Sequence, residues 1–550
     1  MGVPRFFSWI SKNYSVIINP IIKPNEFYFD LNCLLHPVCF SVANEVYKQK
    51  DHISNDILES KMYNKIIEYI TEILDYIQPT DLIYFAIDGV APLAKMKHQR
   101  LRRFKSVKEQ EIRNQILKNY KQEIPTKWNN TVITPGTNFM KKLAIVLLKF
   151  LKNYKSLHNN IKVILSTSNT HGEGEHKIHQ YLKEQNNKES IKVIYGLDAD
   201  LIFLTMATQL PKLYVFREAQ QIDEKSTNKF LMIDMDLLKE GIYDDIQSKC
   251  EKKLDKDSII NDYIELGFLL GNDFLPNIPS LTLSPIHYKL ENGLDILLEI
   301  YPKFIETNDY IHKSDESLLN LFEILSNMEE EYFKKMYTKG RVYMKCNESE
   351  PCKIALFEFD NLLLSDINEL NIGKDNPKEY KKRYYNHFFH TKNSKNINEI
   401  CKDYLIGLSW VKKYYFDDCP DWNWLYQHHQ VPFISDLYEY MKSEKNLPQI
   451  IVKDNKYLIR PLDQLMMVIP PEISNILPNE CQNIFKNKEL NKYFPKEYDF
   501  DIFMKNKFWM CHPIIPNPNY NDFIKEIEKI RLTEESVKLN KNFKPLEINL

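Results

Sequence analysis

Residues 161–182 read IKVILSTSNTHGEGEHKIHQYL, and residues 191–204 read IKVIYGLDADLIFL. In each segment an apolar run typical of a strand ends in a turn that contains glycine, and a helical pattern separates the two runs. A strand, a helix and a second strand in this order predict a parallel βαβ unit. In open α/β sheets the ligand site lies beyond the carboxyl ends of the strands. Acidic residues occupy that position after both runs: Glu173, Glu175, Asp198 and Asp200.

Carboxylates that crowd one edge of a sheet repel one another, so a bound hard cation with oxygen ligands is the simplest reason for them. The alternative for Glu173 and Glu175 alone is a solvated acidic turn before a helix, whose N-terminus favours negative charge. The second acidic segment favours the metal site over this alternative. Three more carboxylates close apolar runs elsewhere in the chain: Asp30, Asp88 and Asp273. The sequence therefore predicts a divalent-metal cluster of seven acidic side chains.

A basic segment, APLAKMKHQRLRRFKSVKEQE at 91–111, directly follows the run that ends in Asp88. Four of its side chains share one face at helical spacing: Lys95, Gln99, Arg102 and Arg103. A basic run is most often a solvated helix face. Because this one begins beside the predicted metal site, we interpret it as a phosphate-binding face, in which Arg pairs bidentately and Lys supplies a point charge.

The composition limits the class of protein. At 550 residues the chain has room for a large core and more than one domain. Its formal net charge is −2, so any affinity for nucleic acid must come from a local patch. The nine cysteines include no CxxC pair, which argues against a zinc site and a disulfide framework and favours an intracellular protein. No apolar run reaches membrane-spanning length, and the N-terminus lacks the apolar core of a signal peptide.

The pattern also divides the chain into parts. We expect an α/β domain over 1–340, a polar variable linker over 341–378 and a helical region over 379–550. Helices are expected over 61–77, 141–154, 231–239 and 259–270, and the aromatic N-terminal segment 1–14 is expected to dock. Tryptophans cluster at Trp410, Trp422 and Trp424, which is more often a core feature than a binding surface.

These segments together resemble the XRN family of 5′→3′ exoribonucleases. The matching stretches of the first half are MGVPRFF (1–7), FDLNCLLH (29–36), AIDGVAPLAKMKHQRLRRF (86–104), ITPGTNFM (133–140), HGEGEHKI (171–178), YGLDADLIFL (195–204) and LGNDFLPNIPSL (270–281). Those of the second half are EYKKRYY (379–385), GLSWVKKYYFDDCPDWNW (407–424) and PLDQLMMVIPP (461–471). They follow the family's order and cover most of 1–340 and 379–530.

The resemblance implies a PIN/FEN-like α/β nuclease core, with a mixed, mostly parallel sheet flanked by helices, and a mainly helical second region packed against it. The acidic residues fall on the family's metal-site positions, and the basic face falls on its 5′-monophosphate pocket. His36 matches the histidine that stacks on the 5′-terminal base, although its position alone would favour a core histidine. Trp410 is the candidate for its aromatic partner.

The chain departs from the family pattern in places. Leu93 and His171 stand where the family usually has a basic residue and a proline, and neither is a proposed ligand. The chain also ends with the second region, without the long C-terminal extension of the cytoplasmic members. The nuclear or cytoplasmic branch is therefore open, and we expect a monomer located in the cytoplasm rather than the nucleus.

The implied reaction is hydrolysis of single-stranded, 5′-monophosphorylated RNA from its 5′ end to nucleoside 5′-monophosphates, in RNA decay or processing. Two Mg²⁺ or Mn²⁺ ions, about 4 Å apart, would activate a water and stabilise the leaving oxygen. The acidic ligand set suits these ions and argues against zinc. Two alternatives stay open. One is a flap-endonuclease-like DNA nuclease with the same acidic core, and the other is a catalytically silent RNA-binding scaffold, which the complete set of carboxylates disfavours.

Overall fold

The structure is a computed structural model that describes residues 6–18, 22–49, 53–219, 229–342, 344–366, 368–444, 446–456 and 458–549. The predicted docking of the first residues, up to Arg5, lies outside this part of the chain. The rest of that segment forms α1 (Phe6–Asn13), in which Phe6 is buried and stacks on Phe203 with ring centroids 4.4 Å apart. Trp9 donates a hydrogen bond from Nε1 to Asp295 at 2.9 Å, so the described part of the segment is docked.

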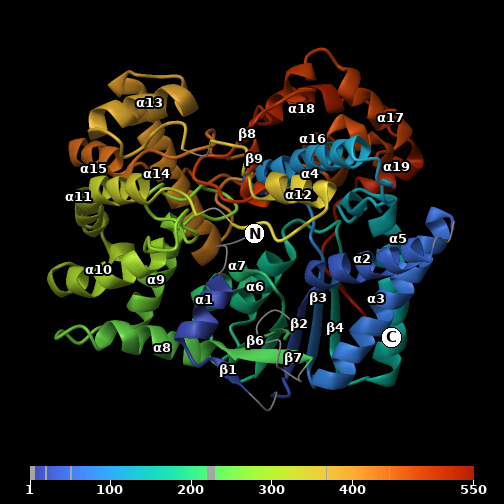
Figure 1. Cartoon of the computed structure of the whole chain (residues 1–550). Helices are drawn as coiled ribbons and strands as arrows, with labels where there is room; N and C mark the ends of the chain where they lie inside the picture. Colours follow the sequence, from blue (N-terminus) through green and yellow to red (C-terminus); the bar gives the residue numbers. More distant parts are fainter. Residues whose placement is uncertain are drawn as a thin grey trace.

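A mixed sheet forms the centre of the first half, with the strand order β1-β7-β6-β5-β2-β3-β4-β10 (Figure 1). The neighbours from β6 to β4 run parallel, and the outer pairings are antiparallel. The strands are β1 (Ile17–Ile18), β2 (Glu26–Asp30), β3 (Leu82–Ala86), β4 (Lys162–Ser166), β5 (Lys192–Tyr195), β6 (Leu213–Glu218), β7 (Phe230–Asp234) and β10 (Leu546–Glu547). This arrangement confirms the predicted βαβ unit and the mostly parallel sheet.

Two layers of helices cover the sheet because its strands are apolar on both faces. Residues such as Phe27, Phe29 and Phe85 pack toward α2 (Asn32–Lys48), α3 (Asn55–Ile77) and α5 (Asn138–Leu157). The alternate residues, such as Tyr28 and Tyr84, belong to the core on the other face. The helices of that core are α4 (Leu93–Asn119), α6 (Gly174–Gln185), α7 (Ala199–Ala207), α8 (Met235–Gln247) and α9 (Lys256–Leu269). Among them, α6 contacts β2 and β3, and α8 contacts β6.

The predicted helix over 231–239 is wrong in its first half. Residues Phe230–Asp234 form β7, which pairs antiparallel with β6, and α8 begins only at Met235. The apolar residues of this strand are buried, as expected of a strand covered on both faces. Asp234 ends the strand and caps the helix, since its Oδ1 accepts hydrogen bonds from the amides of Asp236 and Leu237 at 2.9 and 3.0 Å.

The chain is mainly helical from α10 onward, which includes the helical region predicted over 379–550, and this half packs on the same core as α4 and α6 (Figure 1). Its elements are α10 (Gly293–Thr307), α11 (Asp315–Lys339), α12 (Pro351–Asp360), α13 (Pro377–Phe389), α14 (Ser394–Phe416), α15 (Ile434–Ser443), α16 (Pro461–Val468), α17 (Asn479–Gln482), β8 (Phe500–Asp501), β9 (His512–Pro513), α18 (Tyr520–Ile527) and α19 (Glu534–Leu539). The predicted linker contains a helix, α12, which contacts α4. Among the described helices, none has the length and hydropathy that a membrane crossing requires.

Candidate active site

The parallel strands bring their carboxyl ends together, because Asp30 pairs in register with Ala86, and Ala86 with Ser166. Each predicted acidic residue follows a strand of this group or the end of a packed helix. Asp30 is the last residue of β2, Asp88 follows β3, and Asp273 follows α9. The other four stand at the first turns of α6 and α7: Glu173, Glu175, Asp198 and Asp200. The structure therefore brings the predicted carboxylates to one edge of the sheet.

Burial makes this cluster electrostatically unfavourable without a cation. Burial, and then the charges of Asp88 and Asp198, raise the pKa of Asp30 well above its ordinary value. Burial, followed by the charge of Asp200, likewise raises the pKa of Glu175. For Asp200, burial and then the charge of Asp273 raise the pKa to about 7. Asp198 differs from these groups because its side chain is exposed.

Three buried oxygens of the cluster have no hydrogen-bond partner among the described residues: Asp30 Oδ1, Glu175 Oε2 and Asp200 Oδ1. Buried polar atoms without partners are rare, and a bound ion is one accepted reason for them. Hard divalent cations prefer such carboxylate oxygens. The residues present therefore fit a divalent cation of the Mg²⁺ type, which makes the cluster a candidate metal site.

Cys33 lies in the same place, although no sequence pattern indicated that it belongs to the cluster. One potential ligand atom from each of Asp30, Cys33 and Asp198 lies within 4.8 Å of the others. The thiol donates a hydrogen bond to Asp30 Oδ2 at 3.0 Å. Burial, and then the charge of Asp30, raise the pKa of this thiol well above its ordinary value, so Cys33 remains protonated and acts as a donor.

Gly174 allows Asp30 and Asp88 to approach the start of α6. A Cβ at this position would lie 2.6 Å from Asp30 Oδ1 and 3.4 Å from Asp88 Oδ1. The Gly174 amide donates to Asp88 Oδ1 at 2.7 Å, and the Asn32 side chain donates to Asp88 Oδ2 at 2.8 Å. Glycine is therefore required at position 174, because the Asp30 carboxylate lies too close to the backbone to leave room for a Cβ.

Lys95 lies among the carboxylates rather than beside the other predicted phosphate-binding side chains. Its Nζ is 2.7 Å from Asp273 Oδ2, and it also forms an ion pair with Glu173 Oε1. Burial alone would lower the pKa of Lys95, but the charges of Asp273 and Glu173 raise it well above its ordinary value. Lys95 therefore neutralises part of the acidic cluster in this structure.

Four of the remaining predicted side chains line one cavity of about 440 Å³ together with two of the carboxylates. Its wall includes Asp88, Asp273, His36, Gln99, Arg102 and Arg103. Residues of the second region line the same cavity, and they include His429, Trp509 and His512. The acidic edge and the cationic helix face thus open into the same space.

The cationic side of the cavity has a neutral ring and two guanidinium groups. Arg102 is exposed, while Arg103 donates from Nη2 to Thr134 Oγ1 at 2.9 Å. Burial, and then the charge of Arg102, lower the pKa of Arg103 to about 9, so the Arg103 guanidinium is still charged at neutral pH. Burial, and then the charges of Arg102 and Arg103, lower the pKa of His36 to about 4, so its ring is neutral. The Gln464 side chain donates to Gln99 Oε1 at 3.3 Å.

The structure does not bring Trp410 to His36. The indole of Trp410 is 0% exposed and lies outside the lining of the cavity. It stacks between Tyr414 and Trp424, and its Nε1 donates to the carbonyl of Asp421 at 3.0 Å. A ring enclosed on both faces has no free surface for a base, so this geometry gives the predicted stacking role of Trp410 no support.

Tyr414 is a contact to the cluster that sequence reasoning missed. Its hydroxyl donates to Glu173 Oε2 at 3.0 Å, across a sequence separation of 241 residues. The available signal was weak: Tyr414 follows Trp410 by one helical turn in GLSWVKKYYF, so the two share a face. Lys177 was missed as well, and its ammonium holds the loops after β3 and β4 by donating to the carbonyls of Ile87 and Thr167 at 2.7 and 3.0 Å.

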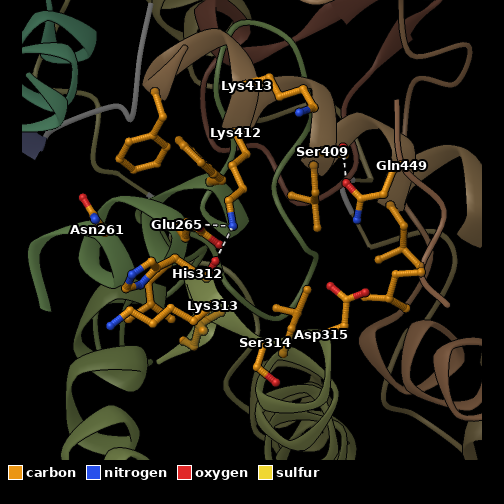
Figure 2. A pocket seen from close by; sticks show the side chains of 18 of the residues that line it. Asn261, Glu265, His312, Lys313, Ser314, Asp315, Ser409, Lys412, Lys413 and Gln449 are labelled. Atoms are coloured by element: carbon orange, nitrogen blue, oxygen red, sulfur yellow. Dashed lines mark hydrogen bonds and ion pairs between the residues drawn. The ribbon is translucent and has the colours of Figure 1, made fainter. Parts of the chain in front are cut away.

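A second cavity, of about 460 Å³, lies between α9, α11 and α14 and contains none of the predicted residues. Figure 2 shows that Lys412 extends from α14 into its centre, toward Glu265 and the carbonyl of His312. The ion pair to Glu265 Oε1 measures 2.7 Å, and the hydrogen bond to the His312 carbonyl measures 2.9 Å. These contacts connect α14, which carries Tyr414, to α9, which leads to Asp273.

Comparison with known proteins identifies the two halves separately. Residues 1–219 match the XRN 5′-3′ exonuclease N-terminus, and residues 253–354 and 368–547 match the Xrn1 helical domain. The helical match begins inside the range that the sequence pattern assigned to the first domain. It spans the predicted linker except for 355–367.

Curated relatives extend over nearly the whole chain. The 5′-3′ exoribonuclease 1 of Homo sapiens is 26% identical over 94% of this chain and 33% of its own length. The 5′-3′ exoribonuclease 2 of Candida albicans is 26% identical over 94% of this chain and 71% of its own length. The 5′-3′ exoribonuclease 1 of Schizosaccharomyces pombe is 27% identical over 98% of this chain and 49% of its own length. The chain thus spans from 33% to 71% of the length of these relatives.

Among solved structures, the catalytic core of Rad2 in complex with a DNA substrate aligns with a TM-score of 0.29 and 14% identity, over 58% of this chain and 80% of that one. This likeness is distant, and the family assignment rests on the two matched domains. Together they cover most of the chain. The chain therefore belongs to the XRN family of 5′→3′ exonucleases.

Proposed function

We propose that this chain is a 5′→3′ exoribonuclease that degrades single-stranded RNA with a 5′-monophosphate to nucleoside 5′-monophosphates. One observation carries the proposal: the acidic edge of the sheet and the cationic face of α4 open into the same cavity of about 440 Å³. Hydrolysis of a phosphodiester beside a terminal phosphate needs both parts at close range. The relatives named above as 5′-3′ exoribonucleases support the same activity.

The carboxylates would hold two divalent ions, Mg²⁺ or Mn²⁺. Bound there, these ions would activate a water and stabilise charge on the leaving oxygen. The chain's own residues would do the rest. Arg102 and Arg103 would bind the terminal phosphate by charge-assisted hydrogen bonds, and Gln99 would orient it. The neutral ring of His36 would stack on the terminal base, a contact that tolerates every base.

The size of the cavity supports selection of RNA that carries a 5′-monophosphate. A terminal phosphate bound to α4 would place the first linkage near Asp88 and Asp273, which line the same cavity. A triphosphate or cap would add bulk and misplaced charge where the monophosphate binds. The second region supplies part of the cavity wall and would narrow its entrance, so a duplex would have to unwind before its end could enter.

One digestion experiment tests this proposal against its alternatives. A single RNA sequence would be prepared with a 5′-monophosphate, a 5′-triphosphate or a 5′-hydroxyl, and a DNA of the same sequence would serve as the comparison. We expect Mg²⁺-dependent release of nucleoside 5′-monophosphates, and only the monophosphorylated RNA should be degraded at the full rate. The Asp200→Asn variant should bind this RNA and release no product, because it loses a metal ligand but keeps the cationic face.

Other outcomes would select a rival. Preferential cleavage of the DNA, or of a DNA duplex that carries a single-stranded flap, would favour the flap-endonuclease-like alternative. Binding of RNA with no cleavage in Mg²⁺ or Mn²⁺ would favour the silent scaffold. The number of ions is tested separately, by calorimetric titration of Mn²⁺ into the protein, where a stoichiometry of one would contradict the two-ion part of the proposal.

A further inference from the structure

The hydroxyl of Tyr414 is a contact between the second region and the acidic cluster, at 3.0 Å from Glu173 Oε2. We propose that Tyr414 is a positioning residue that fixes the Glu173 carboxylate for the divalent metal, and that Trp410 and His176 hold the Tyr414 ring for this purpose. The inference rests on the metal-dependent function proposed above. It assigns the buried Trp410 a role in holding the Tyr414 ring, in place of stacking on a base.

The Glu173 carboxylate is held by two side chains, and Tyr414 is one of them. Glu173 precedes α6 as its N-cap residue, but its side chain accepts no capping hydrogen bond from the helix. Its Oε1 pairs with Lys95 instead, and its Oε2 accepts from Tyr414. Both oxygens are therefore fixed by side chains from other elements. In metal sites, such outer hydrogen bonds orient the ligand and set its affinity.

A stack of aromatic rings fixes the position of Tyr414. His176 lies parallel to the Tyr414 ring on one side, with centroids 3.9 Å apart and an interplanar angle of 1°. Trp410 lies on the other side at 4.8 Å and 14°, and Trp424 continues the stack behind it at 5.2 Å. Phe274, the residue after Asp273, meets the edge of the same ring at 4.9 Å. The stack thus joins α6, α14 and the loop that carries Asp273.

The helix that carries Tyr414 is itself anchored close to this point. Lys412 precedes Tyr414 by two residues and forms the ion pair with Glu265 of α9 that Figure 2 displays. Its hydrogen bond to the carbonyl of His312 adds a third element. A helix held on one face by an ion pair and on the other by stacked rings leaves the Tyr414 hydroxyl little freedom, which is the condition for orienting a ligand.

The alternative is that the buried hydroxyl only satisfies its own hydrogen-bonding need with the nearest acceptor. That role would affect stability but leave metal binding unchanged. Tyr404 provides a matched control, because it lies on the same helix, is 0% exposed and has a hydroxyl without a partner among the described residues. Tyr414→Phe and Tyr404→Phe remove the same atom from the same helix, and only the first removes a contact to the cluster.

The test measures Mn²⁺ binding to the full chain by calorimetry without RNA, with thermal melting of each variant. We expect Tyr414→Phe to weaken Mn²⁺ binding by about tenfold to a hundredfold, the usual effect of losing such an outer contact. Tyr404→Phe should bind Mn²⁺ like the wild type. In the digestion assay the deficit of Tyr414→Phe should shrink as Mg²⁺ is raised, and RNA binding in EDTA should be unchanged.

Equal Mn²⁺ affinity in Tyr414→Phe and wild type would overturn the inference, as would a wild type that binds no Mn²⁺. A deficit that stays constant at every Mg²⁺ concentration would also contradict it, since a general packing defect is not relieved by metal. The test is separable from the proposed function. If Mn²⁺ affinity falls as expected but the wild type degrades no RNA, the positioning role stands and the exoribonuclease proposal fails.

Discussion

Lys95 Nζ lies 2.7 Å from Asp273 Oδ2, and this contact separates Lys95 from the arginines on the same helix. Lys95 stands in the first turn of α4, where a side chain leans back toward the preceding strand end. Arg102 lies about two turns further on, at the exposed side of the cavity. The two residues share a helical face in the sequence but have different neighbours in the structure.

This difference predicts that Lys95→Ala and Arg102→Ala act in different ways. Lys95→Ala should lower cleavage of 5′-monophosphate and 5′-hydroxyl RNA alike, because it changes the charge of the acidic cluster. Arg102→Ala should reduce the preference for the monophosphate by about tenfold to a hundredfold, the worth of a charge-assisted hydrogen bond. Initial rates on both RNAs measure the ratio. If Lys95→Ala alone changes that ratio, Lys95 contacts the phosphate and its ion pairs are secondary.

Gly174→Ala tests the close approach at the start of α6. The added Cβ would lie 2.6 Å from Asp30 Oδ1, so the carboxylate has to move away from its place in the cluster. The Cβ would also lie 3.3 Å from the Ala86 carbonyl oxygen, but alanine is the better helix former at a position that begins a helix, so we expect α6 to form. We expect a loss of cleavage and weaker Mn²⁺ binding with nearly unchanged thermal melting. Wild-type Mn²⁺ affinity in this variant would show that Asp30 tolerates the displacement and is not a ligand.

The sequence predicted the parallel strands and the acidic edge because each is a local pattern. An apolar run followed by Asp or Glu can be recognised without knowing what packs on it. The pairings of β2 with β3 and with β5 then place the carboxyl ends of these strands side by side. The error at Phe230–Asp234 has the opposite origin, since a short apolar run fits a strand and a helix equally until its neighbour is known. The contact of Tyr414 with Glu173 joins residues 241 positions apart, so local pattern could not predict it.

The raised pKa of Asp200 predicts how stability depends on pH. Its pKa is about 7 in the folded chain against an ordinary 3.8, so between these values the folded state binds more protons than the unfolded state. The free energy of unfolding should therefore fall as pH rises through this window when no divalent metal is present. Thermal melting in EDTA at about pH 5 and about pH 8 measures the change.

Asp200→Asn is the control for this prediction, because it removes the titrating group and keeps its shape. In EDTA the variant should lose less stability than the wild type between the two pH values. Mn²⁺ should stabilise the wild type more at the higher pH, where more of the cluster is ionised, and should stabilise the variant less. A variant with the same pH dependence as the wild type would show that Asp200 is already ionised at low pH.

His36 lines the cavity together with Arg102 and Arg103, and its low pKa keeps the ring neutral at the pH of an assay. If it stacks on the terminal base, His36→Ala should slow digestion of every sequence by a similar factor, because each base offers a π-face. Stacking is worth roughly 1–3 kcal/mol per base, so the slowing should be measurable. His36→Phe should restore much of the rate, since it keeps an aromatic ring and removes only the nitrogens.

The measurement compares both variants with the wild type on 5′-monophosphorylated homopolymers, and thermal melting verifies that each variant is folded. Because the ring titrates only at a pKa of about 4, the ratio of wild-type to His36→Ala rates should be constant between about pH 6 and about pH 8. Suppose instead that His36→Phe is as slow as His36→Ala and equally stable. The imidazole nitrogens would then be the groups that matter, as hydrogen-bonding partners of the phosphate held by Arg102 and Arg103, and the stacking role would be wrong.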